Sequence, residues 1–122
     1  MSKGPYIRFN TPKELSDVAL QALEVAADSG KVRRGTNEAT KAIERSVAIL
    51  IYIAEDVQPP EVIAHLPLLC EEKNIPYVYV PTRQALGTAS GIDVPTAAVA
   101  ILQAGKAESS IKDITEKLKA LK

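Results

Sequence analysis

The sequence predicts an α/β fold, a three-layer α/β/α sandwich around a small mixed sheet. Segments of helical periodicity alternate along the chain with short runs of β-branched and aromatic residues, as expected of strands packed between helices. One of these runs, Val47 to Ala54, is apolar throughout and is typical of a strand buried on both faces. A length of 122 residues suits one folding unit, so residues 1–122 are expected to form a single domain.

The first helix is expected to begin at Pro12 and to be ended by Gly30. Thr11 to Glu14 form a capping box with proline at the first helical position, and glycine commonly terminates helices. The apolar stripe between these points has helical spacing and consists of Leu15, Val18, Ala19, Ala22, Val25 and Ala26. A short strand, Lys31 to Arg33, is expected to follow.

A second helix is expected from Asn37 to about Ser46, with Thr36 as its N-cap and Gly35 as a hinge. The next elements are predicted to be the strand Val47–Ala54, a short helix from Pro60 to His65, a helical segment from Leu68 to Lys73 and the strand Tyr77–Val80. A short helix from Arg83 to Leu86 is expected to follow, capped by Thr82 and stopped by Gly87. The chain is then expected to form the strand Thr96–Leu102 and a last helix from Ser110 to Leu121, whose apolar face consists of Ile111, Ile114, Leu118 and Leu121.

The start of the second helix has the chemistry of an anion site. A helix that begins after Gly35 directs its first N–H groups and the positive end of its dipole at any anion in front of them. Asn37 and Lys41 are four residues apart and share one face, with Glu38 beside them. These side chains donate and accept hydrogen bonds next to a phosphate position, which suits the reading of base edges. The alternative is ordinary helix capping without a ligand.

Two other segments are expected near the carboxyl edge of the sheet. Gln58 and Val62 follow the strand Val47–Ala54, and Arg83 follows the strand Tyr77–Val80. If these strands are parallel, both loops emerge at the same edge, where ligands of open α/β folds bind. The second helix does not have to start at that edge, so its place beside these loops is a separate hypothesis.

The third segment is the glycine-rich loop between Gly87 and Pro95, which carries Ile92 and Val94. Loops lie at the surface and often carry function, and exposed apolar residues on them are typical of a contact surface. The alternative is that one of these side chains packs into the core.

The charge balance counts against a protein that coats nucleic acid nonspecifically. The chain has 15 basic and 15 acidic residues and no net charge, whereas such binding rests on many phosphate contacts. Between Lys31 and Arg45, however, five basic and two acidic residues give a local charge of +3. Only 4% of the residues are aromatic, so stacking surfaces for single strands are scarce. A compact basic site is compatible with this composition, and a long electrostatic track is not.

Little in the sequence favours catalysis. Cys70 is the single cysteine and His65 the single histidine, and both are expected to be packing residues. Glu55 and Asp56 are expected to form a solvated turn rather than a pair of catalytic acids. We expect no metal, no cofactor and no enzymatic activity, because ligand clusters and nucleotide-binding loops are missing. No apolar run is long enough to span a bilayer and no leader opens the chain, so a cytoplasmic protein without a membrane partner is expected.

Three motifs resemble those of a known family. The segment GTNEATKAIER at residues 35–45, HLPLLCE at 65–71 and QALG at 84–87 are similar to the motifs of the kink-turn RNA-binding family of the archaeal large-subunit ribosomal protein L7Ae. The resemblance covers essentially the whole chain. The family also includes the eukaryotic box C/D core protein. Ser46 stands where many relatives have glycine, and Ile92-Asp93-Val94 replaces a commoner Leu-Glu-Val.

The resemblance implies an RNA-binding role without catalysis. It implies a structural component of the large ribosomal subunit and the initiating core protein of box C/D particles, which direct ribose 2′-O-methylation. Archaeal members also join box H/ACA particles and ribonuclease P, which acts in tRNA processing. The implied partners are ribosomal RNA, box C/D and H/ACA guide RNA and ribonuclease P RNA. Other guide-particle proteins, including a separate fibrillarin-type methyltransferase, would be reached mainly through the shared RNA.

The resemblance also assigns residues. Asn37, Glu38 and Lys41 match the positions that read tandem sheared G·A pairs, and Gln58, Val62 and Arg83 match those that shape a pocket for an extruded nucleotide. Ile92-Asp93-Val94 matches the loop that covers bulged bases. The full set of implied RNA-binding residues is Arg34, Gly35, Thr36, Asn37, Glu38, Lys41, Gln58, Val62, Arg83, Ile92, Asp93 and Val94, with Arg34 and the helix start holding phosphate.

Two other hypotheses belong to different classes. A small enzyme could hold an anionic metabolite at the Thr36–Asn37 helix start, but the sequence offers it no acid/base pair. A protein–protein adaptor would bind its partners in the absence of RNA.

Overall fold

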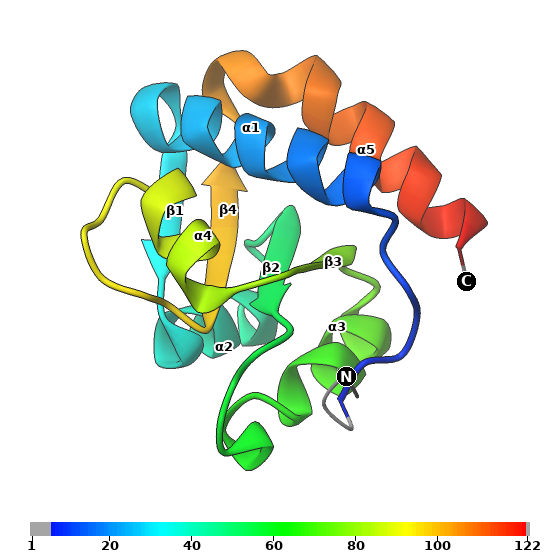
Figure 1. The fold of residues 1–122 in the computed structure, drawn as a ribbon. Coiled ribbons are helices and arrows are strands. Elements are labelled where there is room, and N and C mark those ends of the chain that lie inside the picture. The colour runs from blue at the N-terminus through cyan, green and yellow to red at the C-terminus, as the bar shows by residue number, and fades with distance from the viewer. Residues whose placement is uncertain (1–5, 122) are drawn as a thin grey trace.

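The computed structural model describes residues 6–121 and has helices on both faces of a four-stranded mixed sheet (Figure 1). Its strands are β1 (Lys31–Arg34), β2 (Leu50–Ala54), β3 (Tyr77–Val80) and β4 (Ala98–Gln103). Its helices are α1 (Lys13–Ser29), α2 (Thr36–Glu44), α3 (His65–Lys73), α4 (Arg83–Ala89) and α5 (Glu108–Ala120), with the 3-10 turns η1 (Pro60–Val62) and η2 (Gly105–Ala107). Helices α1, α4 and α5 lie on one face and α2 and α3 on the other, so the predicted α/β/α sandwich is confirmed.

The sheet order brings four strand ends to one edge. The strands lie in the order β1-β4-β2-β3, with β2 and β3 parallel and β4 antiparallel to both of its neighbours. In this register Ala54 pairs with Val80, and Ile53 pairs with Ala98. Arg34 pairs with Val99. The carboxyl ends of β1, β2 and β3 and the amino end of β4 therefore share one edge, which we call the site edge.

The two strands predicted to be buried form the centre of the core. Every residue of β2 and of β3 is buried, because helices cover both faces of the sheet. The strand begins at Leu50, however, and not at Val47, which is 46% exposed. The amides of Val47 and Ala48 both donate to the carbonyl of Ala42, so this stretch closes the end of α2 before the strand starts.

Two predicted helix caps are wrong. The hydroxyl of Thr11 does not cap α1; it accepts a hydrogen bond from the amide of Tyr79 at 3.3 Å, and the helix starts one residue after Pro12. Thr36 is the first residue of α2 rather than its cap, because Gly35 takes that position with φ 100°. The helix ends at Glu44, two residues before the predicted end.

Other helix boundaries differ for tertiary reasons. The buried face of α1 includes Ser16 and Leu23, whereas Val18 and Val25 of the predicted stripe are 41% and 40% exposed. Helix α3 begins at His65 and accommodates a proline in its first turn, where no intrahelical N–H bond is lost. Strand β4 is Ala98–Gln103 rather than Thr96–Leu102.

Helix α4 continues through Gly87 to Ala89, so this glycine does not stop it. The predicted Thr82 cap is confirmed, since its hydroxyl accepts from the amide of Ala85 at 3.0 Å. The last helix has the predicted buried face of Ile111, Ile114 and Leu118, while Leu121 follows its end.

The segment before α1 covers β3, which is an outermost strand of the sheet. The hydroxyl of Tyr79 donates to the carbonyl of Tyr6 at 2.8 Å and accepts from the amide of Arg8 at 3.0 Å. The hydroxyl of Tyr6 in turn donates to the carbonyl of Ala54 at 2.8 Å, at the site edge. Burial raises the pKa of Tyr79 to about 12. No helix within residues 6–121 is long and apolar enough to cross a membrane.

Candidate functional site

The three segments singled out in the sequence meet at the site edge. The amide of Gly35, which precedes α2, donates to the carbonyl of Ala98 at 2.8 Å, so α2 starts beside the amino end of β4. The amide of Thr96 donates to the carbonyl of Arg83 at 3.1 Å, which joins the loop before β4 to the start of α4. Because β2 and β3 are parallel, the loop after β2 emerges there too. The hypothesis that α2 begins at this edge is confirmed (Figure 1).

The first turn of α2 is open to a ligand. Gly35 has a positive φ that residues with side chains rarely adopt, and a β-carbon built there would have no atom within 4 Å. The amide of Ala39 donates to the carbonyl of Gly35 at 2.9 Å and closes the first helical turn. The N–H groups before Ala39 have no carbonyl partner inside the helix, which makes this turn a candidate anion site.

The side chains that follow are held together. Asn37 and Lys41 are exposed, and Glu38 is half-buried. The Lys41 Nζ atom lies 3.4 Å from the Glu38 Oε2 atom, so a donor and an acceptor already stand side by side. They line an open cleft of about 390 Å³, which we call the basic cleft and which is formed by Lys31, Arg33, Glu38, Lys41, Ala42, Arg45, Val47, Leu102 and Gln103.

The loop after β2 presents a second group of predicted residues. Gln58 is exposed, and Val62 in η1 is 46% exposed although it is apolar. Arg83 is fixed by Asp56, whose Oδ1 atom accepts from the Arg83 amide at 2.9 Å and lies 3.5 Å from its Nε atom. Asp56 was expected only in a solvated turn. Asp56 is the second residue after β2, and Arg83 follows β3. The expectation that these two strands are parallel was the sequence signal that could have placed the two residues close together.

The glycine-rich loop forms the third part of the site. We call residues 91–95 the flap; Ile92 is half-buried within it, and Asp93 and Val94 are exposed, Val94 by 59%. The amide of Ile92 donates to the carbonyl of Gly87 at 3.1 Å. The guanidinium of Arg34 donates to the carbonyl of Ser90 from Nε at 2.8 Å and also from Nη2. Ser90 was not singled out in the sequence, although it joins the flap to β1.

The single histidine and the single cysteine differ in their exposure to solvent. His65 was expected to be packed, and this prediction is wrong: its side chain is exposed, and its Nε2 atom lies 2.8 Å from the hydroxyl of Thr40 on α2. Cys70 is fully buried, as predicted. His65 therefore links α3 to the helix that carries the site.

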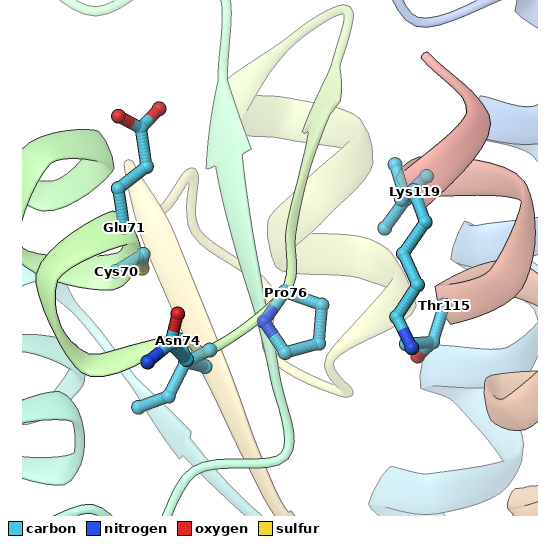
Figure 2. Close-up of a pocket in the computed structure, with 8 residues that line it drawn as sticks. Cys70, Glu71, Asn74, Pro76, Thr115 and Lys119 are labelled. Atoms are coloured by element: carbon cyan, nitrogen blue, oxygen red, sulfur yellow. The ribbon is translucent and has the colours of Figure 1, made fainter. Parts of the chain in front are cut away.

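A second cavity lies at the opposite edge of the sheet. It is a groove of about 490 Å³ between the end of α3 and α5, and its lining is formed by Cys70, Glu71, Asn74, Ile75, Pro76, Thr115, Leu118 and Lys119. Figure 2 shows Glu71 and Asn74 on one side of Pro76 and Thr115 and Lys119 on the other. Pro76 precedes β3, so this groove is separate from the site edge, and none of the predicted site residues lines it.

Comparisons with known proteins agree with the fold. A family model described as the Ribosomal protein L7Ae/L30e/S12e/Gadd45 family matches residues 17–111, which include every predicted site residue. Among solved structures, the chain is similar to the Giardia lamblia 15.5kD RNA binding protein, with 36% sequence identity and a TM-score of 0.87. That match covers 98% of this chain and 99% of the other. The chain therefore belongs to the Ribosomal protein L7Ae/L30e/S12e/Gadd45 family.

Proposed function

We propose that this protein binds RNA without catalysis and stabilises kink-turns, which are sharp bends built on tandem sheared G·A pairs. The observation that carries the proposal is the meeting, at one edge of the sheet, of a polar helix start and an apolar flap. Arg34, which directly precedes the Gly35 cap of α2, donates to the carbonyl of Ser90, which directly precedes the flap. The similarity to a structure named as an RNA binding protein supports RNA as the ligand.

The side chains of α2 suit the exposed edges of guanine. Regular A-form RNA hides its major groove from side chains, whereas a sharp kink opens it. Lys41 and Asn37 donate to guanine O6 or N7, and Glu38 accepts from guanine N–H groups. Because Glu38 and Lys41 already stand 3.4 Å apart, little side-chain entropy is lost when they bind a donor–acceptor pair on the RNA.

The remaining residues hold the backbone and the unstacked bases. The N–H groups after Gly35, with Thr36 in the first turn, offer a phosphate site at the positive end of the helix dipole. Gln58, Val62 and Arg83 are exposed around the loop after β2 and form the proposed pocket for an extruded nucleotide. Ile92 and Val94 give dry contacts to splayed bases, with Asp93 between them as an acceptor.

Binding of this kind works by population shift. A kinked RNA is a minor conformer without protein, and preferential binding of the bent form raises its population. Since recognition rests on few charged contacts, we expect the affinity to depend only modestly on salt.

The proposed setting is ribonucleoprotein assembly in the cytoplasm. The RNA partners we propose are ribosomal RNA of the large subunit, box C/D and H/ACA guide RNA, and ribonuclease P RNA. In guide particles, a separate fibrillarin-type methyltransferase would supply the chemistry and would be reached mainly through the shared RNA. The family assignment supports a ribosomal or related RNA as the general class of partner.

One pair of titrations tests the proposal. A kinked RNA is compared with the same RNA whose two sheared G·A pairs are replaced by Watson–Crick pairs. Each lost recognition step costs about 1–3 kcal/mol, so the replacement is expected to weaken binding by roughly 30-fold or more. Equal affinities for the two RNAs would reject kink-turn recognition.

A further inference from the structure

Arg33 and Arg34 are neighbours in β1 and serve different surfaces. Successive side chains of a strand point to opposite faces of the sheet. Arg33 lines the basic cleft together with Lys31 and Lys41. Arg34 lines a different cleft of about 340 Å³, in which the other charged residues are Glu24 and Asp28 of α1. The two arginines thus have the same charge but opposite electrostatic surroundings.

The guanidinium of Arg34 is committed within the protein. Its Nε atom donates to the carbonyl of Ser90 at 2.8 Å, and its Nη2 atom donates to the same oxygen. Ser90 is fully buried, and its hydroxyl donates to the carbonyl of Gly87 at 2.9 Å. A β-carbon built on Gly91 would lie 3.6 Å from the Arg34 Nη2 atom, so the first residue of the flap lies beside this side chain. Arg34 therefore satisfies a backbone carbonyl at the root of the flap.

The surroundings of Arg34 also oppose a phosphate. Two carboxylates, from Glu24 and Asp28, line the same cleft, and they repel an anion that approaches the guanidinium from that side. In the basic cleft on the other face of β1, four basic side chains line the cleft with a single carboxylate, that of Glu38. A phosphate contact is therefore better supported at Arg33 than at Arg34.

We propose that Arg34 is a positioning residue, which fixes the flap relative to α2, rather than a residue that binds phosphate. The proposal rests on the RNA-binding function given above and assigns this residue a role within it. By holding residues 91–95 in place before RNA arrives, Arg34 removes part of the entropic cost of ordering the flap on binding.

The first experiment uses the free protein and needs no RNA. Amide hydrogen exchange is measured for Gly91 and Ile92, whose N–H groups donate to the carbonyls of Thr88 and Gly87, both at 3.1 Å. Arg34→Lys and Arg34→Gln are expected to accelerate this exchange about tenfold, because neither side chain reproduces the fork of two N–H donors. Arg33→Gln is the matched control, from the same strand and with the same change of charge, and is expected to leave flap exchange unchanged.

The second experiment separates positioning from phosphate binding. Affinity for a kinked RNA is measured at several salt concentrations for the parent, Arg34→Lys and Arg34→Gln. A positioning role predicts that both variants bind about tenfold more weakly with the salt slope of the parent. A phosphate contact predicts that lysine restores the affinity and that glutamine lowers the slope by roughly 0.7–0.9.

The outcomes are decisive in either direction. Unchanged flap exchange in both Arg34 variants would overturn the positioning role whatever the affinities, and so would full rescue of binding by lysine. If the parent does not discriminate the kinked RNA from its Watson–Crick counterpart, the proposed function fails instead. The exchange measurement still reports on the contact between Arg34 and Ser90, so the two failures remain distinguishable.

Discussion

A β-carbon built on Gly87 would lie 2.1 Å from the carbonyl oxygen of Val94, so the flap crosses α4 at a point where no side chain fits. Gly87 lies inside the helix, and glycine has the lowest helix propensity of all residues except proline. The close approach of the flap explains why the helix nevertheless contains glycine here. The backbone of Val94 rests on α4, while its side chain is 59% exposed.

Substitution of Gly87 tests this crossing. From helix propensity alone, Gly87→Ala would stabilise the protein by about 0.5–1 kcal/mol. Because the added methyl group meets backbone, we expect destabilisation by roughly 1–3 kcal/mol and weaker RNA binding. Urea unfolding and an RNA titration measure the two effects. Gln84→Ala, on the same helix and exposed, is the control and should leave the stability within about 0.5 kcal/mol of the parent. A more stable Gly87→Ala variant would contradict the contact.

Glu38 and Lys41 are expected to act together on RNA. Each of Glu38→Ala and Lys41→Ala should weaken binding of a kinked RNA by roughly 1–3 kcal/mol, because each removes a contact to a base edge. Their ion pair implies that the double variant loses less than the sum of the single losses. Glu44→Gln, exposed at the end of the same helix, is a control for charge. Gel-shift titrations in which the single variants match the parent would remove both residues from the interface.

Ser46 is expected to carry backbone strain. Its φ is 56°, a left-handed conformation that costs a residue with a side chain roughly 1–2 kcal/mol. Ser46→Gly relieves this strain, and the added freedom of the unfolded chain offsets about 0.4–1 kcal/mol of the gain. We expect a net stabilisation of about 0.5–1 kcal/mol by thermal or urea unfolding, with RNA affinity unchanged. Ser46→Ala keeps the β-carbon and should show no such gain.

Stability is expected to fall in strong alkali because of the core tyrosines. Burial raises the pKa of Tyr79 from 10.0 to about 12, and burial also raises the pKa of Tyr52 and Tyr77. A raised folded-state pKa means that the stabilisation is complete below pH 10 and is lost as the pH rises from 10 through about 12. For Tyr79 the rise of about 2 corresponds to roughly 2–3 kcal/mol. Unfolding free energies measured from pH 8 to pH 12 test this, and Tyr79→Phe should flatten the decline.

Most of the fold was predictable because it depends on local patterns. The strands β2 and β3 were predicted from short apolar runs rich in β-branched and aromatic residues, and the buried stripe of α5 was predicted from helical periodicity. Helix caps depend on where a hydroxyl finds its partner. Thr82 caps its own helix, whereas Thr11 bonds the amide of Tyr79, 68 residues away. Local preference cannot distinguish these two threonines.

Only the local part of the candidate site was predictable from the sequence. Asn37, Glu38 and Lys41 come together through the spacing of one helix turn, which the sequence specifies. The contact of Arg34 with Ser90 spans 56 residues, and that of Asp56 with Arg83 spans 27. Asp56 and Arg83 meet because β2 and β3 are parallel neighbours in the sheet. Arg34 lies in β1, which reaches the rest of the sheet only through β4, and this strand order was not evident from the sequence.

The placement of charge on the two sides of the sheet gives this neutral molecule a preferred orientation in an electric field. Helix α1 carries Lys13 against Glu14, Asp17, Glu24 and Asp28, one positive and four negative charges or −3. Residues 31–45 carry four basic and two acidic residues or +2 when Arg34, which faces the α1 side, is left out. The field of a polyanion therefore exerts a torque that turns the basic side forward and the acidic side away. An encounter with RNA starts from a productive orientation more often than chance allows, although the net attraction between the two molecules is small.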